Sequence, residues 1–301
     1  MDYGRPITFG YFPSPDVRGY DQVLETVQLA DELGLELIGI QDHPYQQQFL
    51  DTWTLTSALA PRTRRTTFFP DVANLPLRPP AVLAKAAASL DHITGGRIEL
   101  GLGSGGFWPA IVAMGGRQLR AGDAVSALEE AIQVIRLMWS GEHSARFAGR
   151  FYSLSGVRPG PPPAHPMGIW LGGYRPRMLR ITGRLADGWV PSLPYMPPEQ
   201  IGEASARIDE AAVAAGRDPR DIRRVCNVWG RITDGTTGAA DQWEWPAERW
   251  VDTLTTLAVE HGIDSFPFGP AGDAAGQLRR LAQEVAPAVR ANAHRARAMG
   301  A

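Results

Sequence analysis

The feature that most constrains the fold of this sequence is a regular alternation of short apolar segments and longer amphipathic ones. The short segments have the length and composition of buried strands, and the longer ones carry apolar residues at helical spacing. Alternating units of this kind require parallel strands joined by right-handed crossovers. The predicted strands are Ile7–Phe12, Leu35–Gln41, Thr66–Val72, Arg97–Leu100, Gly168–Leu171, Asp187–Pro191, Ile222–Ile232 and Ile263–Phe268.

Eight strand–helix units predict an α/β protein with the architecture of a (β/α)8 TIM barrel, which typically takes about 250 residues. The chain has 301 residues and no linker or shift in composition, so we expect one domain over residues 1–301. Glu142–Pro166 fits neither a strand nor a helix of the alternation. We interpret it as an insertion after the fourth βα unit that forms a small hairpin or loop.

Local signals place the helices between these strands. Gly34 and Gly216 stand where two amphipathic segments stop, and Pro79-Pro80 precede a third, as helix ends and starts prefer. The predicted helices are Gly19–Leu33, Asp51–Ala60, Ala81–Leu90, a long helix with Asp123 as its N-cap, Arg175–Leu185, Pro198–Gly216, Ala247–His261 and Ala271–Met299. Gly106–Gly122 and Thr233–Pro246 are predicted to be irregular.

Composition excludes several classes of partner. Charged residues make up 21% of the chain and the net charge is −2, so no basic field indicates nucleic acid or an anionic membrane. No segment approaches the roughly 18 apolar residues of a membrane span, and Met1–Gly10 lacks an apolar signal core. The single cysteine, Cys226, forms no internal disulfide and fits a reducing compartment. We therefore expect a cytoplasmic protein.

A glycine-rich segment after the fourth predicted strand invites a nicotinamide-dehydrogenase interpretation. Gly101, Gly103 and Gly106 match the G-x-G-x-x-G dinucleotide fingerprint. That fingerprint normally lies in the first βα turn, and Pro109 interrupts the long helix that should follow. The acid in range, Asp123, resembles a helix N-cap rather than a residue at the end of a strand. These observations argue against a nicotinamide dehydrogenase, which stays an alternative that would require tight binding of NAD through Gly101–Gly106.

The carboxyl ends of barrel strands form the active site in this architecture. Here they carry glycines, small polar residues and aromatics, which suit a flat cofactor with an acidic tail. They lack the cluster of His and carboxylate side chains that a metal site needs, so we expect no metal. His43 is the only one of the six histidines at a strand end, and it is either an acid–base group or a loop histidine bonded to its neighbours.

Two further positions have alternative interpretations. Asp42 either caps the turn that follows or orients a bound ring. Gly172-Gly173 is either a simple turn or, with Arg175 at the start of the next helix, an anion site. Arg177 and Arg180 are as well explained by a solvated basic helix face.

Several motifs in combination resemble the bacterial luciferase-like flavin-dependent oxidoreductases, from about Gly10 to Asp187 and more loosely to the end. The motifs are Pro76-Leu77-Arg78-Pro79-Pro80, Leu83-Ala84-Lys85, Ser89-Leu90-Asp91, Gly95-Gly96-Arg97, Gly101-Leu102-Gly103, Ile169-Trp170-Leu171-Gly172-Gly173 and Ala186-Asp187-Gly188-Trp189. The resemblance implies a (β/α) barrel, often a homodimer, that binds FMN or the deazaflavin coenzyme F420 and a small-molecule substrate.

The resemblance also implies roles for individual residues. Asp71-Val72-Ala73-Asn74 would pass behind the ring, with a non-proline cis peptide at Asp71-Val72. Gly172, Gly173 and Tyr174 match the phosphate-binding turn, and Asp42-His43 resembles the pair of the deazaflavin branch, in which Asp contacts the ring and His lies near the reacting carbon. The expected catalytic residue is His43. The expected cofactor-binding residues are Asp42, Asp71, Val72, Ala73, Asn74, Gly103, Ser104, Gly172, Gly173, Tyr174 and Arg175.

One departure from the family bears on the substrate. Deazaflavin-dependent sugar-phosphate dehydrogenases have a catalytic Glu after strand four, where this chain has Ser104–Trp108, so a sugar phosphate is not expected. Aromatic residues suggest an apolar pocket instead: Tyr45, Trp53, Phe107, Trp108 and Trp243. We expect hydride transfer between F420 and a small organic substrate, with His43 handling the proton. The alternatives are an FMN-dependent monooxygenase with a separate reductase and a non-catalytic flavin-binding protein.

Overall fold

Parallel strands form the centre of the computed structural model, which describes residues 2–235 and 243–300. One sheet has the order β12-β11-β13-β1-β2-β3, and a second has the order β10-β9-β8-β5-β4. Every pairing in these two sheets is parallel, as the alternation predicted. The strands are β1 (Thr8–Tyr11), β2 (Leu37–Ile40), β3 (Thr67–Pro70), β4 (Ala73–Asn74), β5 (Leu100–Gly103), β8 (Ile169–Leu171), β9 (Gly188–Trp189), β10 (Arg223–Arg224), β11 (Val228–Thr233), β12 (Glu244–Pro246) and β13 (Ser265–Pro270).

Single parallel bridges link the two sheets at two places. Phe68 of β3 pairs with Ile98, just before β5, and Val225, just after β10, pairs with Ser265 of β13. The strands of both sheets therefore run in the same direction, and their carboxyl ends lie on the same side of the molecule. The site described below lies on that side.

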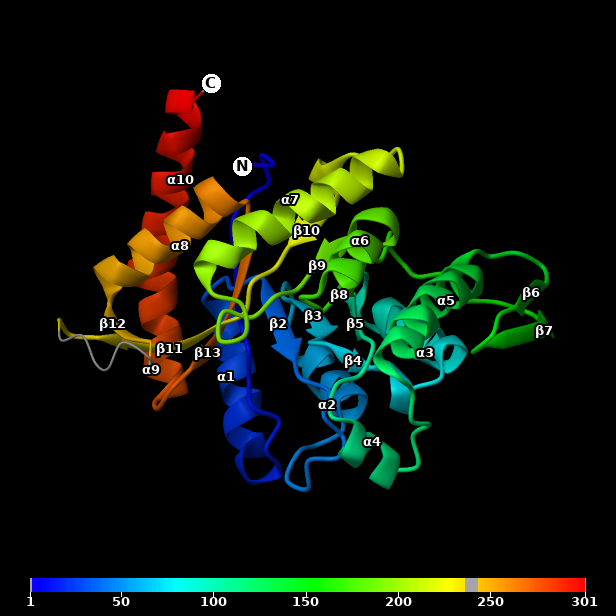
Figure 1. The fold of residues 1–301 in the computed structure, drawn as a ribbon. Helices are drawn as coiled ribbons and strands as arrows, with labels where there is room; N and C mark the ends of the chain where they lie inside the picture. The colour runs from blue at the N-terminus through cyan, green and yellow to red at the C-terminus, as the bar shows by residue number, and fades with distance from the viewer. Residues whose placement is uncertain (1, 236–242, 301) are drawn as a thin grey trace.

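Helices lie around the strands (Figure 1). They are α1 (Tyr20–Glu32), α2 (Thr52–Leu59), α3 (Pro80–Thr94), α4 (Trp108–Ala113), α5 (Ala121–Trp139), α6 (Pro176–Leu185), α7 (Pro198–Ala214), α8 (Ala247–His261), α9 (Ala274–Arg280) and α10 (Ala286–Gly300). Local chemistry sets their ends. The Asp51 carboxylate caps α2 by accepting the Thr54 N–H at 2.9 Å, and Gly95 ends α3 at a φ of 70° that favours glycine.

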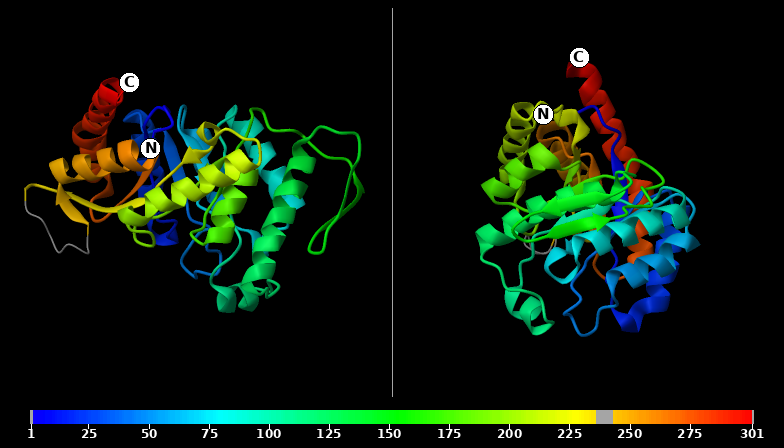
Figure 2. Two further views of the ribbon diagram at one scale, coloured as in Figure 1. Left: turned by 45° about the horizontal axis from the view of Figure 1, so that its top comes forward. Right: turned by 90° about the vertical axis from the view of Figure 1, so that its right-hand side faces the viewer.

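An antiparallel hairpin of β6 (Ala145–Ala148) and β7 (Ser153–Val157) lies within the segment predicted to be irregular at 142–166. It projects beyond α5, at the end of the molecule opposite to α8 and α10 (Figures 1 and 2). The prediction of a small hairpin there is confirmed.

Several predicted boundaries are wrong. The fourth strand runs over Leu100–Gly103 rather than Arg97–Leu100, so two of the loop glycines are strand residues. Ile222–Ile232 divides into β10 and β11. The closing helix is interrupted by a π-helix at Leu281–Val285. Short-range patterns define such ends least well, because pairing with neighbouring strands decides them.

The segments predicted to be irregular contain short elements. Helix α4 lies within Gly106–Gly122, and β12 lies at the end of Thr233–Pro246, whose residues 236–242 fall outside the described part of the chain. Asp123 is not an N-cap, since α5 begins two residues earlier. The Asp123 carboxylate instead pairs with Arg150 of the hairpin connection at 3.0 Å.

Buried apolar residues form two clusters. The larger, here the outer cluster, packs strand residues such as Ile38 and Ile40 against the helices. The smaller, here the inner cluster, comes from strands of both sheets and is made of Leu37, Phe69, Trp170, Val190 and Val225. Successive strand residues point to opposite faces, so β2, β3 and β8 each contribute residues to both clusters. Among the described residues, no helix is long and apolar enough to cross a membrane.

Candidate active site at the carboxyl ends of the strands

A polar layer lies directly above the inner cluster. Because strand side chains alternate, the residue two positions after each inner-cluster residue faces the same side, one step nearer the carboxyl end. These residues, here the mouth layer, are Gly39, Asp71, Gly172, Ser192 and Asn227. The inner cluster consists of bulky apolar side chains, whereas the mouth layer consists of two glycines and three short polar residues. These small residues leave room for a flat ring over the carboxyl ends of the strands.

Contacts confirm that the members of the mouth layer lie together. A Cβ built on Gly39 would lie 2.9 Å from the Asp71 Oδ2 atom. The Asn227 amide donates to the Ser192 hydroxyl at 3.2 Å, and it lies close enough to Asp71 to influence that carboxyl. Ser192 and Asn227 also form a parallel bridge.

Asp71 is the titratable group of this layer. Its backbone N–H donates to the Ile40 carbonyl at 2.7 Å, and its Oδ2 atom is buried with no hydrogen-bond partner. Burial raises the pKa of Asp71 to about 7, and the hydrogen bond from the Asn227 side chain opposes the shift. Asp71 therefore titrates near neutral pH, unlike an ordinary aspartate.

The peptide bond between Asp71 and Val72 is cis, which confirms the expectation drawn from the resemblance. Val72 packs against the inner cluster. Its side chain fills the space beside two glycines, since added Cβ atoms on Gly103 and Gly172 would lie 2.7 and 3.0 Å from it. The predicted residues Asp71, Val72, Gly103 and Gly172 therefore meet at one place.

The side chains of Ala73 and Asn74, the other two residues of the Asp71–Asn74 segment, lie in different surroundings. Ala73 is fully buried in the outer cluster, so its side chain faces away from the mouth layer. Asn74 is also buried, and its Oδ1 atom lacks a hydrogen-bond partner. Only the Ala73 backbone is available to a bound ring, whereas Asn74 offers a free acceptor atom.

Asp42 is 1% exposed, and its carboxylate is occupied within the protein. Arg78 donates to both oxygens, from Nε at 2.6 Å and from Nη2 at 2.7 Å, and the Asn74 N–H donates to Oδ2 at 2.8 Å. Arg78 reaches the Asp51 carboxylate as well, at 2.6 Å. Asp42 thus ties the loop after β2 to the segment before α3, and its contact with a bound ring stays a prediction.

His43, next to this buried pair, is exposed at the edge of the site. Its Nδ1 lies 3.1 Å from the Gln41 Oε1 atom, and its ring stacks on Tyr45 with centroids 5.5 Å apart. Partial desolvation lowers the pKa of His43, and the nearby Asp42 carboxylate opposes the shift. The imidazole is therefore neutral at pH 7 and able to take up a proton.

Two of the aromatic residues expected to form an apolar pocket, Tyr45 and Phe107, lie next to His43 and to each other. Tyr45 packs edge-on against the exposed Phe107 at 5.7 Å. Trp53 packs on the outer cluster instead, and Trp243 stacks with Trp245 at 4.7 Å. The apolar wall beside His43 is therefore made by Tyr45 and Phe107.

The turn after β8 combines glycines with the amino end of α6. The Gly173 carbonyl accepts the Trp189 indole N–H at 2.9 Å, and α6 has no side-chain cap. Tyr174 is half-buried and bonds to Ser192, while Arg175 is exposed at the N-cap of α6. Arg177, by contrast, pairs with Glu129 at 2.8 Å. An uncapped helix start with an exposed Arg175 suits an anionic group.

Buried polar atoms without partners indicate that these residues fit a flat anionic cofactor. Buried oxygens without partners on Asp71, Asn74 and Asn227 all belong to the carboxyl-end region. Such atoms are costly unless something bonds to them. Ser104, also predicted to bind the cofactor, follows β5 and is half-buried. The described residues contain no group of three or more His, Cys, Asp or Glu arranged to hold a metal.

Sequence reasoning missed three residues of the site. Arg78 appears only as part of a family motif, and Ser192 and Asn227 lie at predicted strand ends without being among the expected cofactor-binding residues. Counting two positions onward from the buried residues Val190 and Val225 identifies Ser192 and Asn227. Nothing local identifies Arg78, because its partner Asp42 lies far away in the sequence.

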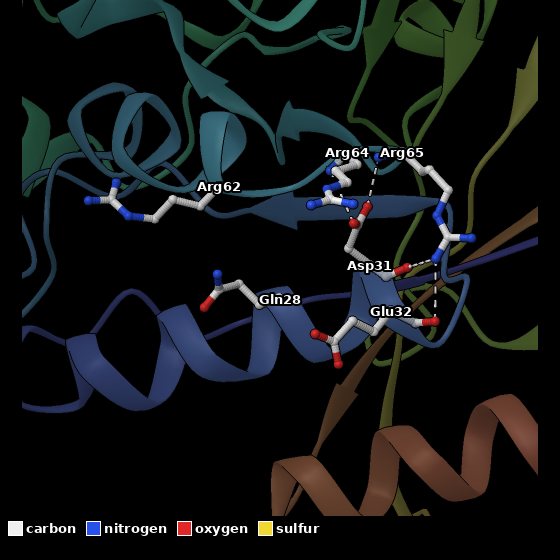
Figure 3. A pocket seen from close by; sticks show the side chains of 6 residues that line it. All are labelled: Gln28, Asp31, Glu32, Arg62, Arg64 and Arg65. Carbon is white, nitrogen blue, oxygen red and sulfur yellow. Dashed lines mark hydrogen bonds between the residues drawn. The ribbon is translucent and has the colours of Figure 1, made fainter.

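A groove of about 570 Å³ lies elsewhere and is not part of this site (Figure 3). It is lined by Gln28, Asp31, Glu32, Arg62, Arg64 and Arg65, from the end of α1 and the segment before β3. The Asp31 carboxylate there accepts backbone N–H groups of Arg64 and Arg65 at 3.0 and 2.8 Å. The groove is therefore a structural junction at the amino end of β3.

Comparison with known proteins finds relatives of this chain. An uncharacterized protein of Mycobacterium tuberculosis (strain ATCC 25618 / H37Rv) is 31% identical over 194 residues, which span 64% of this chain and 65% of the relative, less than two thirds of its length. F420-dependent hydroxymycolic acid dehydrogenase of the same strain is 28% identical over 260 residues, or 82% of this chain and 69% of that one.

Solved structures share the fold. An F420-dependent secondary alcohol dehydrogenase in complex with an F420-acetone adduct superposes with a TM-score of 0.84 at 19% identity, over 95% of this chain and 99% of that chain. The sequence profile described as luciferase-like monooxygenase matches residues 6–290. This chain, with its cis Asp71-Val72 peptide and its glycine-floored strand ends, belongs to the luciferase-like monooxygenase family.

Proposed function

We propose that this protein is an oxidoreductase that uses coenzyme F420 to oxidise or reduce a small organic substrate. The observation that carries the proposal is that the neutral His43 imidazole and the buried Asp71 carboxyl follow two paired strands, β2 and β3, whose carboxyl ends are joined by the hydrogen bond from the Asp71 N–H to the Ile40 carbonyl. F420-dependent relatives support the choice of cofactor, since a hydroxymycolic acid dehydrogenase and a glucose-6-phosphate dehydrogenase that match this chain both use it.

The residues of this chain would hold such a cofactor in two places. Val72, Gly103 and Gly172 form the surface behind the ring, with Asn74 and Ser104 at its edge. Gly173, Tyr174 and Arg175 receive the phosphate at the uncapped start of α6. Bound F420 supplies a carbon that donates or accepts a hydride; the protein positions it.

His43 is the proton-handling group of this proposal. Its imidazole is neutral at pH 7, so it accepts the proton released when an alcohol is oxidised and returns a proton when a carbonyl is reduced. Tyr45 and Phe107 beside it give the substrate an apolar wall. Asp42 does not take part directly, and instead fixes the backbone next to His43 through Arg78 and Asn74.

Closure of the strands into one barrel is also a proposal. We infer that the strands close into a single (β/α)8 barrel over residues 1–301, with residues 142–166 inserted after the fourth βα unit. The bridges Phe68–Ile98 and Val225–Ser265 link the two sheets at two separate places and support closure. A homodimer and a cytoplasmic location stay predictions of the sequence.

Titration of the purified protein with F420 and, separately, with FMN tests the proposal. We expect tight binding of F420, seen as a change in its fluorescence, and weaker binding of FMN. Tight binding of FMN with reductase-dependent oxygen consumption would favour the alternative, an FMN-dependent monooxygenase, which the family's description also allows. Binding without turnover, unaffected by His43→Gln, would indicate a non-catalytic flavin-binding protein.

A further inference from the structure

The proposed function does not explain why the carboxyl of Asp71 is buried in the mouth layer. Asp71 is the acidic side chain of the mouth layer, it faces Gly39 across the layer, and its Oδ2 atom is buried without a partner. An ionised carboxylate in such a place would have the hydrogen bond from the Asn227 side chain but no partner for Oδ2, which is less than a buried charge requires. A neutral carboxylic acid has no such requirement.

Within the described part of the chain, the groups that face Asp71 carry no positive charge. Strand β2 presents Gly39, and the segment after β8 presents Tyr174, which interacts electrostatically with Asp71. Gly172 and Ser192 belong to the same layer of strand-end residues. Cys226 and Asn227 face it from the approach to β11. Of these, Tyr174 and Cys226 titrate, and burial raises the pKa of each, so both are neutral at pH 7.

The ion pairs of Arg78 do not change this picture. Arg78 is engaged by Asp42 and Asp51, which together neutralise its charge, and His43 lies on the solvent side of that pair. The pKa of Asp71 already lies at about 7 because of its burial. A flat ring placed over the layer would remove further water from this carboxyl, and an anionic cofactor would repel its charge. Both effects favour the protonated acid.

We propose that Asp71 works as a neutral carboxylic acid beneath the redox ring, and that binding of the anionic cofactor is coupled to uptake of one proton by this side chain. The inference rests on the proposed function, because it needs a ring over the mouth layer. It assigns Asp71 a positioning role: as a neutral acid it offers an O–H donor to the ring or to the Asn227 amide oxygen, which also lacks a partner.

The test is the pH dependence of F420 affinity, measured by fluorescence titration between pH 6 and pH 8. For wild type relative to Asp71→Asn, we expect the Kd to rise about tenfold over this range, as one proton with a pKa near 7 requires. The cofactor's own titration is common to both proteins and cancels. His43→Gln is the matched control, since a histidine also titrates here; it should keep the wild-type pH profile.

A second measurement uses the protein without cofactor. The infrared carbonyl band of a protonated carboxyl should be present in wild type at pH 6, weaker at pH 8, and absent from Asp71→Asn. If Asp71→Asn does not fold, by circular dichroism, Asp71→Ser replaces it in both measurements.

The outcomes separate the two proposals. Equal pH profiles in wild type and the Asp71 variants, with F420 still bound, would overturn the inference and leave the proposed function intact. No binding of F420 or FMN to wild type at any pH would overturn the proposed function, and the proton coupling with it. A pH step lost in His43→Gln but kept in Asp71→Asn would assign the proton to His43 and reject the inference.

Discussion

The guanidinium of Arg78 holds both carboxylate oxygens of Asp42, at 2.6 and 2.7 Å, inside a site where Asp42 is 1% exposed. The pair joins the loop after β2 to the segment before α3, and it stands directly beside His43. A buried carboxylate with such a partner is satisfied, but it becomes costly if the partner is removed. The geometry next to the candidate catalytic histidine therefore depends on a contact between distant parts of the chain.

Replacing Arg78 by methionine should destabilise the protein by about 3–5 kcal/mol, because it leaves the Asp42 charge buried and unpaired. Urea unfolding followed by circular dichroism gives the free energy of unfolding. Arg18→Met is the matched control: Arg18 also pairs with an aspartate, Asp16, but in solvent, so no measurable change is expected. Equal losses in the two variants would contradict the structural role of the Arg78–Asp42 pair.

His43→Gln should lower kcat by roughly 10²- to 10⁴-fold while the Kd for F420 changes little, because the imidazole handles a proton and does not hold the cofactor. In the direction in which His43 accepts a proton, the wild-type rate should fall as the pH drops through the lowered pKa of the imidazole. Steady-state kinetics with a fluorescence titration separates the two quantities. His143→Gln, at an exposed position in the hairpin insertion, should leave both unchanged.

His165 makes stability depend on pH. Hydrogen bonds to Glu99 and Asp91 raise the pKa of His165 to about 9. A raised pKa means that the folded state binds the proton more tightly than the unfolded state. The stabilisation is therefore complete below about pH 6.5 and is lost as the pH rises through 9. Its size is on the order of 2–3 kcal/mol.

Urea unfolding of wild type and His165→Ala at pH 6 and pH 9.5 measures this effect. The difference between the two proteins should be large at pH 6 and shrink at pH 9.5. His294→Ala, on the exposed side of α10, serves as the control. A difference that does not vary with pH would show that His165 contributes through packing alone.

Gly101→Ala should prevent or severely weaken folding. An added Cβ would lie 2.0 Å from the Pro70 carbonyl oxygen, a backbone atom of β3 that cannot move without breaking the sheet. We expect a loss of at least about 3 kcal/mol, measured by urea unfolding, or an insoluble product. Gly122→Ala, in the first turn of α5 with open space around it, should be neutral or stabilising by up to about 1 kcal/mol. Similar behaviour of the two variants would refute the crowding at Gly101.

Local sequence determined most of the secondary structure. Helix α8 matches its predicted range of Ala247–His261, and the β6–β7 hairpin lies in the segment set apart by its irregular pattern. Periodicity, capping residues and glycine stops act over a few residues, so they can be found without knowing the fold. The cis bond at Asp71-Val72 was implied by family motifs rather than by any local physical signal.

The sequence alone therefore determined the order and type of the elements, the parallel sheet, and which strand ends carry polar residues. The tertiary structure decided what those residues do. In the folded protein Asp42 pairs with Arg78, and the Ala73 side chain lies in the outer cluster. Gly101 and Gly103, which were predicted to lie in a loop, belong to β5. Folding also buries Asp71 beside Asn227, which shifts its pKa toward 7. The reason is physical: periodicity is a property of neighbours along the chain, whereas burial, ion pairing and proton affinity depend on residues that only folding brings together.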